Sequence, residues 1–308
     1  MQNLTLILEG GALRSLYTSG VLDVLMKYNI EANYILGVSA GALTGMKYNI
    51  EANYVLGVSA GALTGMNYVS KQAGRSAKIN IENCDNSRYI GMKALRKEGG
   101  IIGYNYLFDD LSQNAYPFDY EKFKFSDQKF IPVITNCEKG ITEYVEKNEC
   151  KDDIFKVVQA SSSMPLCSKM VKIGGSHYLD GAVTMPIPVD WAIEQNHKNI
   201  LVVLTRDREY RKPEISNTMK SMYKRVYHKY PKLVENLCTM PERYNKLKEH
   251  INDLEKQGRI MVIAPKEPVT VSRLEKDKEK LKKLYEDGKK DMEESIDKLE
   301  TLIKQDLT

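Results

Sequence analysis

The chain of 308 residues has few cysteines and histidines and no long apolar run. Its five cysteines are widely spaced and contain no C-x-x-C pair, which argues against a disulfide framework and a zinc site. A net charge of only +4 is too small to argue for a nucleic-acid partner. No apolar run reaches the length of a membrane span, and the N-terminus lacks a secretory signal pattern. We therefore expect a cytoplasmic globular protein.

The stretch NYVLGVSAGALTG, residues 53–65, contains a G-x-S-x-G pattern centred on Ser59. An apolar run before the pattern and small helix-forming residues after it predict a serine on a sharp turn between a buried strand and a helix. Glycines at Gly57 and Gly61 keep the crowded turn free of side-chain collisions. The helix start behind the serine favours negative charge developing nearby.

The same stretch occurs twice. Residues 26–45 and 46–65 are identical except for Ile35 against Val55, so Ser39 is a second candidate nucleophile. Nothing else in the chain repeats, and two copies are too few for a solenoid. We interpret the repeat as one tandem duplication within a single domain, which we expect to have room for one serine turn.

Loop entropy favours Ser59 over Ser39 as the nucleophile. Extra residues in a surface loop cost little, because closure entropy grows only with the logarithm of loop length. The same residues inserted in a packed helix would interrupt its hydrogen bonds and its apolar face. We therefore expect the first copy to loop out between about Asn29 and Glu51, although its apolar residues would then be exposed.

The first apolar run, Leu4–Leu8, ends at a turn that contains Gly10, Gly11 and Ala12 and leads into a helical pattern. Strand, turn and helix predict the start of an α/β unit. A dinucleotide fingerprint fits poorly, because Ala12 and Ser15 stand where it needs glycine. The small residues fit an oxyanion hole built from backbone N–H groups, or a helix entry that only needs tight packing.

Further strands are predicted at 129–135, 141–145 and 199–204, and a short amphipathic helix at 152–160. The polar region 74–128 is less regular and is placed to cover a site.

Asp180 stands in the stretch YLDGAV, between an apolar strand end and a glycine. This arrangement is a good way to expose a carboxylate at the rim of a sheet. An ordinary Asp-Gly turn is the alternative interpretation.

Taken in order, EGGALRSLYTSGVLD, GVSAG and YLDGA resemble the patatin-like phospholipases, and within them the bacterial soluble branch that carries a helical C-terminal extension. The resemblance implies a three-layer α/β fold with a mostly parallel central sheet. It implies an acyl hydrolase domain over residues 1–205 and a mostly helical extension over 206–308. The motif serine, Ser59 or alternatively Ser39, would be the nucleophile.

The resemblance further implies that Asp180 is the general base and that Gly10, Gly11 and Ala12 form the oxyanion hole. No metal or other cofactor would be needed. The family commonly has glycine where this chain has Ala12 and Ser15, but the backbone of Ala12 still offers an N–H group.

The scarcity of histidine agrees with a serine–aspartate pair. A Ser-His-Asp hydrolase of the elbow type needs a histidine downstream of its acid. His177 precedes Asp180, whereas His197 lies in an exposed-looking turn and the other two histidines lie in the polar tail. A carboxylate beside the serine must then take the proton itself.

The leading expectation is hydrolysis of lipid, and in particular phospholipid, esters through an acyl-enzyme. The basic, tyrosine-rich segment 206–232 suits contact with the inner face of a membrane, or is an ordinary solvated face. The alternatives are a small-ester or thioester hydrolase and a catalytically silent scaffold disabled by the duplication. Oligomeric state and head-group preference leave no signal in the sequence.

Overall fold

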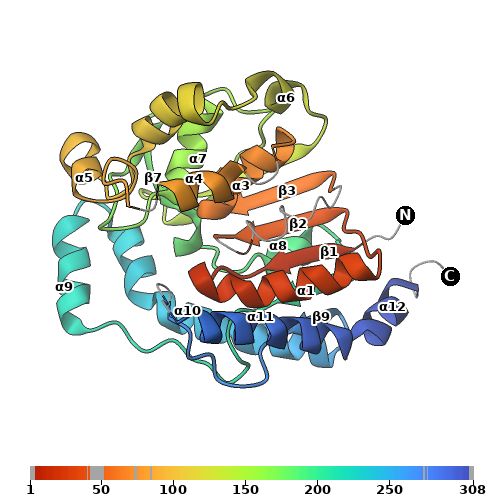
Figure 1. The fold of residues 1–308 in the computed structure, drawn as a ribbon. Helices are drawn as coiled ribbons and strands as arrows, with labels where there is room; N and C mark the ends of the chain where they lie inside the picture. The colour runs from red at the N-terminus through yellow and green to blue at the C-terminus, as the bar shows by residue number, and fades with distance from the viewer. Residues whose placement is uncertain are drawn as a thin grey trace.

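A computed structural model describes residues 4–39, 41, 52–72, 75–83, 85–272, 275 and 277–304. Within these residues the strands form one nine-stranded sheet in the order β6-β7-β4-β3-β2-β1-β8-β9, with β5 paired to β4 (Figure 1). The strands are β1 (Thr5–Leu8), β2 (Tyr34–Val38), β3 (Tyr54–Val58), β4 (Lys129–Asn136), β5 (Ile141–Tyr144), β6 (Val171–Ile173), β7 (Ser176–Asp180), β8 (Ile200–Val203) and β9 (Ile260–Ile263).

Helices cover both faces of this sheet. The α-helices of the described residues are α1 (Ser15–Lys27), α3 (Ala60–Val69), α4 (Arg75–Glu82), α5 (Met92–Glu98), α6 (Tyr120–Phe125), α7 (Ile154–Ser162), α8 (Val189–Glu194), α9 (Asn217–Val226), α10 (Pro231–Lys256), α11 (Lys278–Glu293) and α12 (Ile296–Lys304). Two short 3-10 helices are η1 (Ala12–Arg14) and η3 (Gly181–Val183), and η2 (Tyr106–Ala115) is a π-helix.

The central strands are parallel from β9 to β4, whereas β5, β7 and β6 join antiparallel. Strands β1, β8 and β9 are buried along their whole length, as expected of parallel strands covered on both faces. Their continuous apolar sequences follow from that double burial. The predicted α/β class with a mostly parallel sheet is confirmed.

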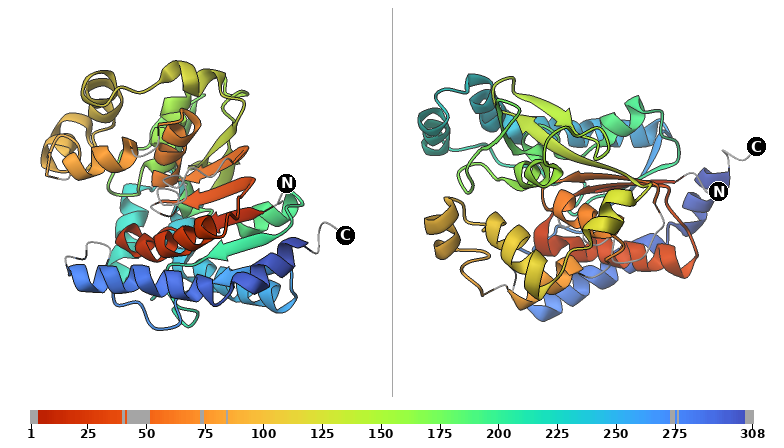
Figure 2. Two further views of the ribbon diagram at one scale, coloured as in Figure 1. Left: turned by 45° about the vertical axis from the view of Figure 1, so that its right-hand side comes forward. Right: turned by 90° about the horizontal axis from the view of Figure 1, so that it is seen from above.

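Two apolar cores give the three layers. On one face, α1, α3, α11 and α12 pack against alternate strand residues such as Leu6 and Ile35. On the other face, α8 and α10 pack against the intervening residues, such as Ile7 and Leu36. The view from above shows the sheet nearly edge-on between these helical layers (Figure 2).

The first copy of the repeat is a strand and not a loop, so the loop-out expectation was wrong. Strand β2 lies between β1 and β3 and pairs with both, and its register sets Ile35 beside Val55 and Gly37 beside Gly57. Each residue of β2 therefore lies next to its own counterpart in the second copy. The expectation that the fold has room for one such turn was also wrong, because β2 has its own place in the sheet and ends at a second serine with positive φ.

Burial explains why the strand is retained. Ile35 and Leu36 are fully buried in the two cores and Val38 is nearly so. A looped-out copy would leave these side chains in water, at a cost of about 1.5–3 kcal/mol each. This exposure cost is much larger than the loop-closure cost, which is only about 0.6 kcal/mol for each doubling of loop length. A new parallel strand also satisfies its backbone groups on both edges. Insertion into the sheet is therefore favoured over a surface loop.

The C-terminal extension belongs to the same sheet. Its strand β9 pairs in parallel with β8 and forms this edge of the sheet. Helix α11 lies along α1, where a Cβ at Gly20 would come within 2.1 Å of the Tyr285 carbonyl oxygen and one at Gly288 within 2.2 Å of that of Tyr17. The predicted helical extension is present, and these glycines let it pack closely on α1.

Candidate active site

Ser59 occupies a strained turn between β3 and α3. Its φ of 61° and ψ of −134° lie in a region that side-chain-bearing residues rarely adopt. The turn is crowded, because a Cβ at Gly57 would lie 2.7 Å from Cα of Ala62. The Ser59 carbonyl accepts a hydrogen bond from Ala62 N at 2.9 Å, which fixes the first turn of α3 behind the serine. The G-x-S-x-G sequence therefore forms the elbow that its pattern predicts.

Asp180 lies at the end of β7 and contacts this serine. Its Oδ2 accepts a hydrogen bond from Ser59 Oγ at 2.6 Å, and its Oδ1 accepts one from Ala182 N at 2.8 Å. The side chain is only 4% exposed. Burial raises the pKa of Asp180 to about 6, against the opposing effect of the hydrogen bonds from Ser59 and Ala182. A carboxylate with this pKa can accept a proton from a serine hydroxyl near neutral pH.

Three consecutive serines at the end of α7, whose role the sequence did not reveal, hold both groups in place. Ser161 Oγ accepts a hydrogen bond from Ser59 N at 3.1 Å, and Ser162 Oγ donates one to the Ser59 carbonyl at 3.1 Å. The Ser163 carbonyl accepts one from Asp180 N at 2.9 Å. Three small polar residues in a row at a helix end are the signal that could have identified them.

The histidines lie elsewhere in the described part of the chain. His197, expected in an exposed turn, is half-buried, with its Nδ1 3.0 Å from Thr5 Oγ1 and its ring 4.2 Å from that of Tyr34. Those residues begin their strands, whereas Ser59 follows the end of β3. His177 and His250 pair with Glu138 and Asp190 at 2.8 and 3.0 Å. Among the described residues, the side chain that accepts the hydrogen bond of Ser59 Oγ is that of Asp180.

The glycine turn lies beside Ser39 and not beside Ser59. A Cβ at Gly10 would be 2.8 Å from Ser39 Cβ, and one at Gly41 would be 2.6 Å from the Glu9 carbonyl oxygen. Ser39 also has a positive φ of 50°, and its N–H donates to the Val58 carbonyl at 2.8 Å. The structure therefore brings Ser59 and Asp180 together and sets Gly10, Gly11 and Ala12 one strand further away.

An apolar cavity of about 420 Å³ opens at these turns. Ala12, Ser39 and Ala60 form part of its wall, although Ser59 is not among the lining residues. Most of the remaining lining comes from α3, α4, η2 and their neighbours, including Leu63, Ile79, Leu107, Phe108 and Phe155. The irregular region 74–128 thus contributes much of the wall of this cavity, which offers an apolar chain room beside the elbows.

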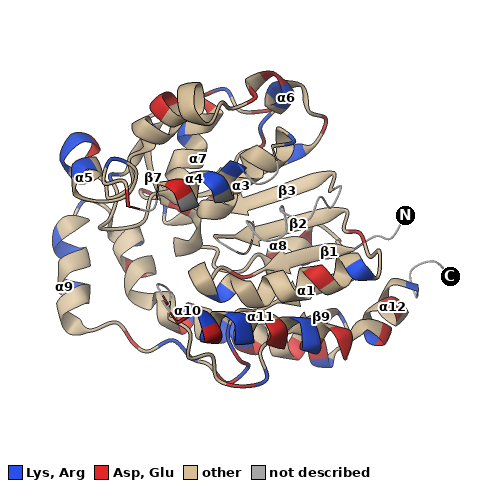
Figure 3. Cartoon of the chain, viewed as in Figure 1, with Lys and Arg blue, Asp and Glu red and all other residues tan. Residues whose placement is uncertain are grey.

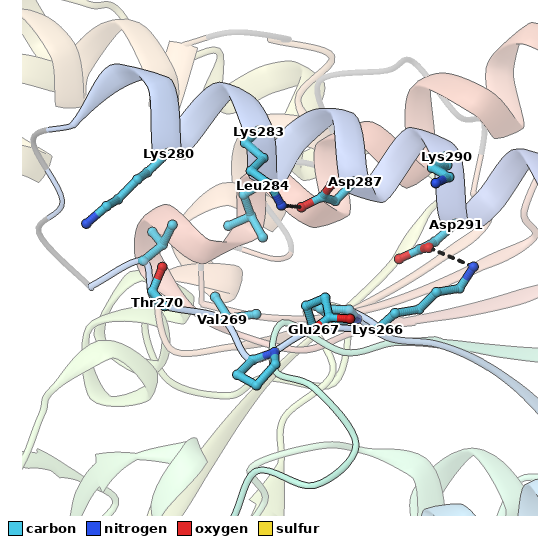
Figure 4. A pocket seen from close by; sticks show the side chains of 13 residues that line it. Lys266, Glu267, Val269, Thr270, Lys280, Lys283, Leu284, Asp287, Lys290 and Asp291 are labelled. Atoms are coloured by element: carbon cyan, nitrogen blue, oxygen red, sulfur yellow. Dashed lines mark hydrogen bonds and ion pairs between the residues drawn. The ribbon is translucent and has the colours of Figure 1, made fainter.

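A second cavity, of about 260 Å³, lies between α11 and the segment that follows β9 (Figure 4). Its Lys283 and Lys266 form ion pairs with Asp287 and Asp291 at 3.0 and 3.2 Å. Neither member of the Ser59–Asp180 pair lines it.

The fold and the elbow define a three-layer α/β protein with a mostly parallel sheet, in which an elbow serine contacts an aspartate. The model of the patatin-like phospholipase family matches residues 6–193, and the chain belongs to this family. The resemblance noted in the sequence is therefore confirmed. Residues 230–304, within the extension, match a domain of unknown function (DUF6363).

Two known proteins are similar to this chain. It is 24% identical over 207 residues to the uncharacterized protein YjjU of Escherichia coli (strain K12), with 66% of this chain and 52% of that protein covered. The chain thus spans about half the length of this curated relative. The crystal structure of VipD from Legionella pneumophila aligns with a TM-score of 0.46 at 13% identity, over 97% of this chain and 67% of that one.

Proposed function

We propose that this protein is a serine acyl hydrolase that cleaves lipid ester bonds, with Ser59 as nucleophile and Asp180 as base. The observation that carries the proposal is the 2.6 Å hydrogen bond between Ser59 Oγ and Asp180 Oδ2 at a strained elbow. Membership of the patatin-like phospholipase family supports a hydrolase. The specific dyad and substrate are the parts that we propose.

The chemistry follows from these positions. Asp180 takes the hydroxyl proton while Ser59 Oγ attacks the ester carbonyl, and the carbonyl oxygen becomes an oxyanion. Collapse returns the proton to the leaving alcohol and leaves an acyl group on Ser59. Asp180 then takes a proton from water, which attacks the acyl-enzyme; collapse of the second intermediate frees the acid and restores the serine. The start of α3, directly behind the serine, favours the negative charge in both steps.

The cavity favours a substrate with an apolar acyl chain. Leu63, Ile79 and Phe108 present hydrocarbon surface close to the elbows. Burying hydrocarbon contributes about 0.8 kcal/mol for each methylene group. A long acyl chain should therefore bind better than a short one, which favours lipid esters over small soluble esters.

Membrane contact has a candidate surface beside the cavity. Ile90 lines the cavity and is 43% exposed, and Met92 and Leu95 on α5 are 59% and 39% exposed. Basic residues follow on the same helix, and α9 presents more of them (Figure 3). Apolar and basic side chains together suit an anionic lipid surface. Across the described residues, no helix has the length and apolar character needed to cross a bilayer.

Fluorophosphonate labelling with mass spectrometry tests the nucleophile. We expect one adduct, on Ser59, and no adduct in the Asp180→Asn variant, because the hydroxyl then lacks its base. An adduct on Ser39 alone would contradict the assignment of Ser59. No adduct on either serine would instead favour the silent scaffold.

Vesicles and a soluble short-chain ester separate the substrate classes. Met92→Glu and Leu95→Glu should lower hydrolysis of anionic phospholipid vesicles and leave the soluble ester unaffected. Met26→Glu, at a residue that is 43% exposed at the end of α1, is the matched control. A wild-type protein that cleaves the soluble ester and ignores vesicles would favour the small-ester or thioester alternative.

A further inference from the structure

The two copies of the repeat separate components that an acyl hydrolase needs together. Strand β1 leads into the glycine turn, and β3 leads into Ser59, but β2 lies between β1 and β3. Through the paired registers, Leu8 of β1 lies opposite Gly37 and Gly37 lies opposite Gly57. Adjacent strands are about 4.8 Å apart, so the exits of β1 and β3 are separated by roughly 9–10 Å.

The space beside the glycine turn is filled by the first copy. Ser39 lies against Gly10, and Gly41 lies against the Glu9 carbonyl with almost no room for a side chain on either glycine. The turn itself is anchored from the far side, where Glu9 Oε2 accepts a hydrogen bond from Thr205 N at 2.7 Å. It cannot move toward Ser59 without breaking that bond and displacing β2.

Each elbow therefore has a different half of the apparatus. Ser59 has the base, with Asp180 Oδ2 at 2.6 Å, but not the glycine turn. Ser39 has the glycine turn beside it, but Asp180 contacts the other serine. Oxyanion donors act only within about 2.7–3.1 Å of the developing charge, so a displacement of one strand removes their effect.

We infer that strand β2 separates the Ser59–Asp180 pair from its oxyanion donors at Gly10–Ala12, and that removing one copy of the repeat would rejoin them. This inference rests on the proposed hydrolase function. Losing one such donor lowers the rate about 10²–10³-fold. The full chain should accordingly be a slow hydrolase with an intact dyad, and the chain with one copy should be at least 100-fold faster.

Because the two copies are tandem, either one can be deleted without creating a new local sequence. Deleting residues 26–45 or residues 46–65 leaves every local junction as it already occurs in the chain, because the copies are tandem. The two shortened proteins differ only by Ile35 against Val55, so each serves as a replicate of the other. In both, the single remaining serine elbow would lie between β1 and β4.

The rate of fluorophosphonate labelling is measured for the full chain and both shortened chains, each checked for folding by thermal unfolding. We expect labelling at least 100-fold faster after either deletion, and none when the remaining elbow serine is replaced by alanine. Folded shortened chains that label no faster than the full chain would overturn the inference and leave the hydrolase proposal standing. No labelling of any of the three would overturn both.

A second measurement does not depend on the shortened chains folding. In a crystal structure of the full chain labelled on Ser59, the phosphoryl oxygens should lie beyond hydrogen-bond reach of the Gly11 and Ala12 backbone nitrogens. A phosphoryl oxygen within about 3 Å of either nitrogen would overturn the inference.

Discussion

The two copies of the repeat have one sequence and two environments. Both form a buried strand that ends at a serine with positive φ, 50° at Ser39 and 61° at Ser59. The first copy lies between two parallel strands, β1 and β3, and its serine abuts Gly10. The second is followed by α3 and pairs with β4, which brings its serine to Asp180.

This difference teaches that the motif makes an elbow but does not by itself make a site. Local sequence fixes the strand and the turn in both copies, since glycines and small residues permit the crowded backbone. The base comes from β7, and the three serines that hold the elbow come from α7. These partners are reached only through strand order, so identical motifs acquire different chemistry.

The largest expected difference between the copies is in activity. Ser59→Ala should abolish ester hydrolysis, because it removes the hydroxyl that Asp180 contacts, whereas Ser39→Ala should leave most of it. Initial rates on a phospholipid and on a soluble ester measure both variants. Loss of activity on Ser39→Ala with a normal thermal midpoint would reverse the assignment of the two elbows.

The next effect belongs to the base of the second copy. The pKa of Asp180 is about 6 in the folded protein against 3.8 for the ordinary side chain. The folded state therefore binds this proton more tightly, and stability is lost as pH rises through about 6. Asparagine does not titrate, so the Asp180→Asn variant avoids this loss of stability. The variant should be inactive, and its free energy of unfolding at pH 7 should be higher by up to about 3 kcal/mol.

The same pKa sets the activity profile. The base must be unprotonated, so kcat/KM should rise with pH through about 6 and then level off. Unfolding by urea at pH 5 and pH 7 tests the stability of Asp180→Asn, with Asp109→Asn, at an exposed aspartate in η2, as the control. A variant that loses stability at pH 7 would contradict the burial cost.

A smaller effect concerns the single difference between the copies. Ile35→Val should destabilise by about 0.5–1.5 kcal/mol, since the side chain is fully buried. Val55→Ile should also destabilise, because a Cβ at Gly65 would already lie 3.3 Å from Val55 Cγ1 and α3 has little room to move away. The midpoints of urea unfolding compare the stabilities of the variants. A stabilising Val55→Ile would show that the space between Val55 and α3 can hold an additional methyl group.

The smallest effect is strain at the elbows. Ser59→Gly and Ser39→Gly should each stabilise the folded protein by about 1 kcal/mol or less, because glycine adopts positive φ without a steric cost. The greater conformational freedom of glycine in the unfolded chain offsets part of this gain. Ser59→Ala and Ser39→Ala are the matched controls, since alanine keeps the Cβ. Equal stability of the glycine and alanine variants would place the strain elsewhere.

Much of the molecule follows from sequence alone, for identifiable physical reasons. The α/β class, the strands at β1, β4 and β8 and the elbow at Ser59 follow from apolar runs and from glycine spacing, which act over a few residues. The place of the first copy could not be derived in this way. The small entropy cost of a surface loop favoured a looped-out first copy. Burial of Ile35 and Leu36 outweighs that argument only because the backbone of β2 can pair with β1 and β3 on its two edges.

The sequence by itself determined that the second copy makes a strand and a serine turn, because those are local properties of GVSAG, whereas it predicted a loop for the first copy. Only the tertiary structure decided which serine meets Asp180 and which meets the glycine turn. Those contacts join residues more than one hundred positions apart in one case, and depend in the other on an inserted strand. Strand order, and not the motif, assigns the base to one copy and the backbone amides to the other.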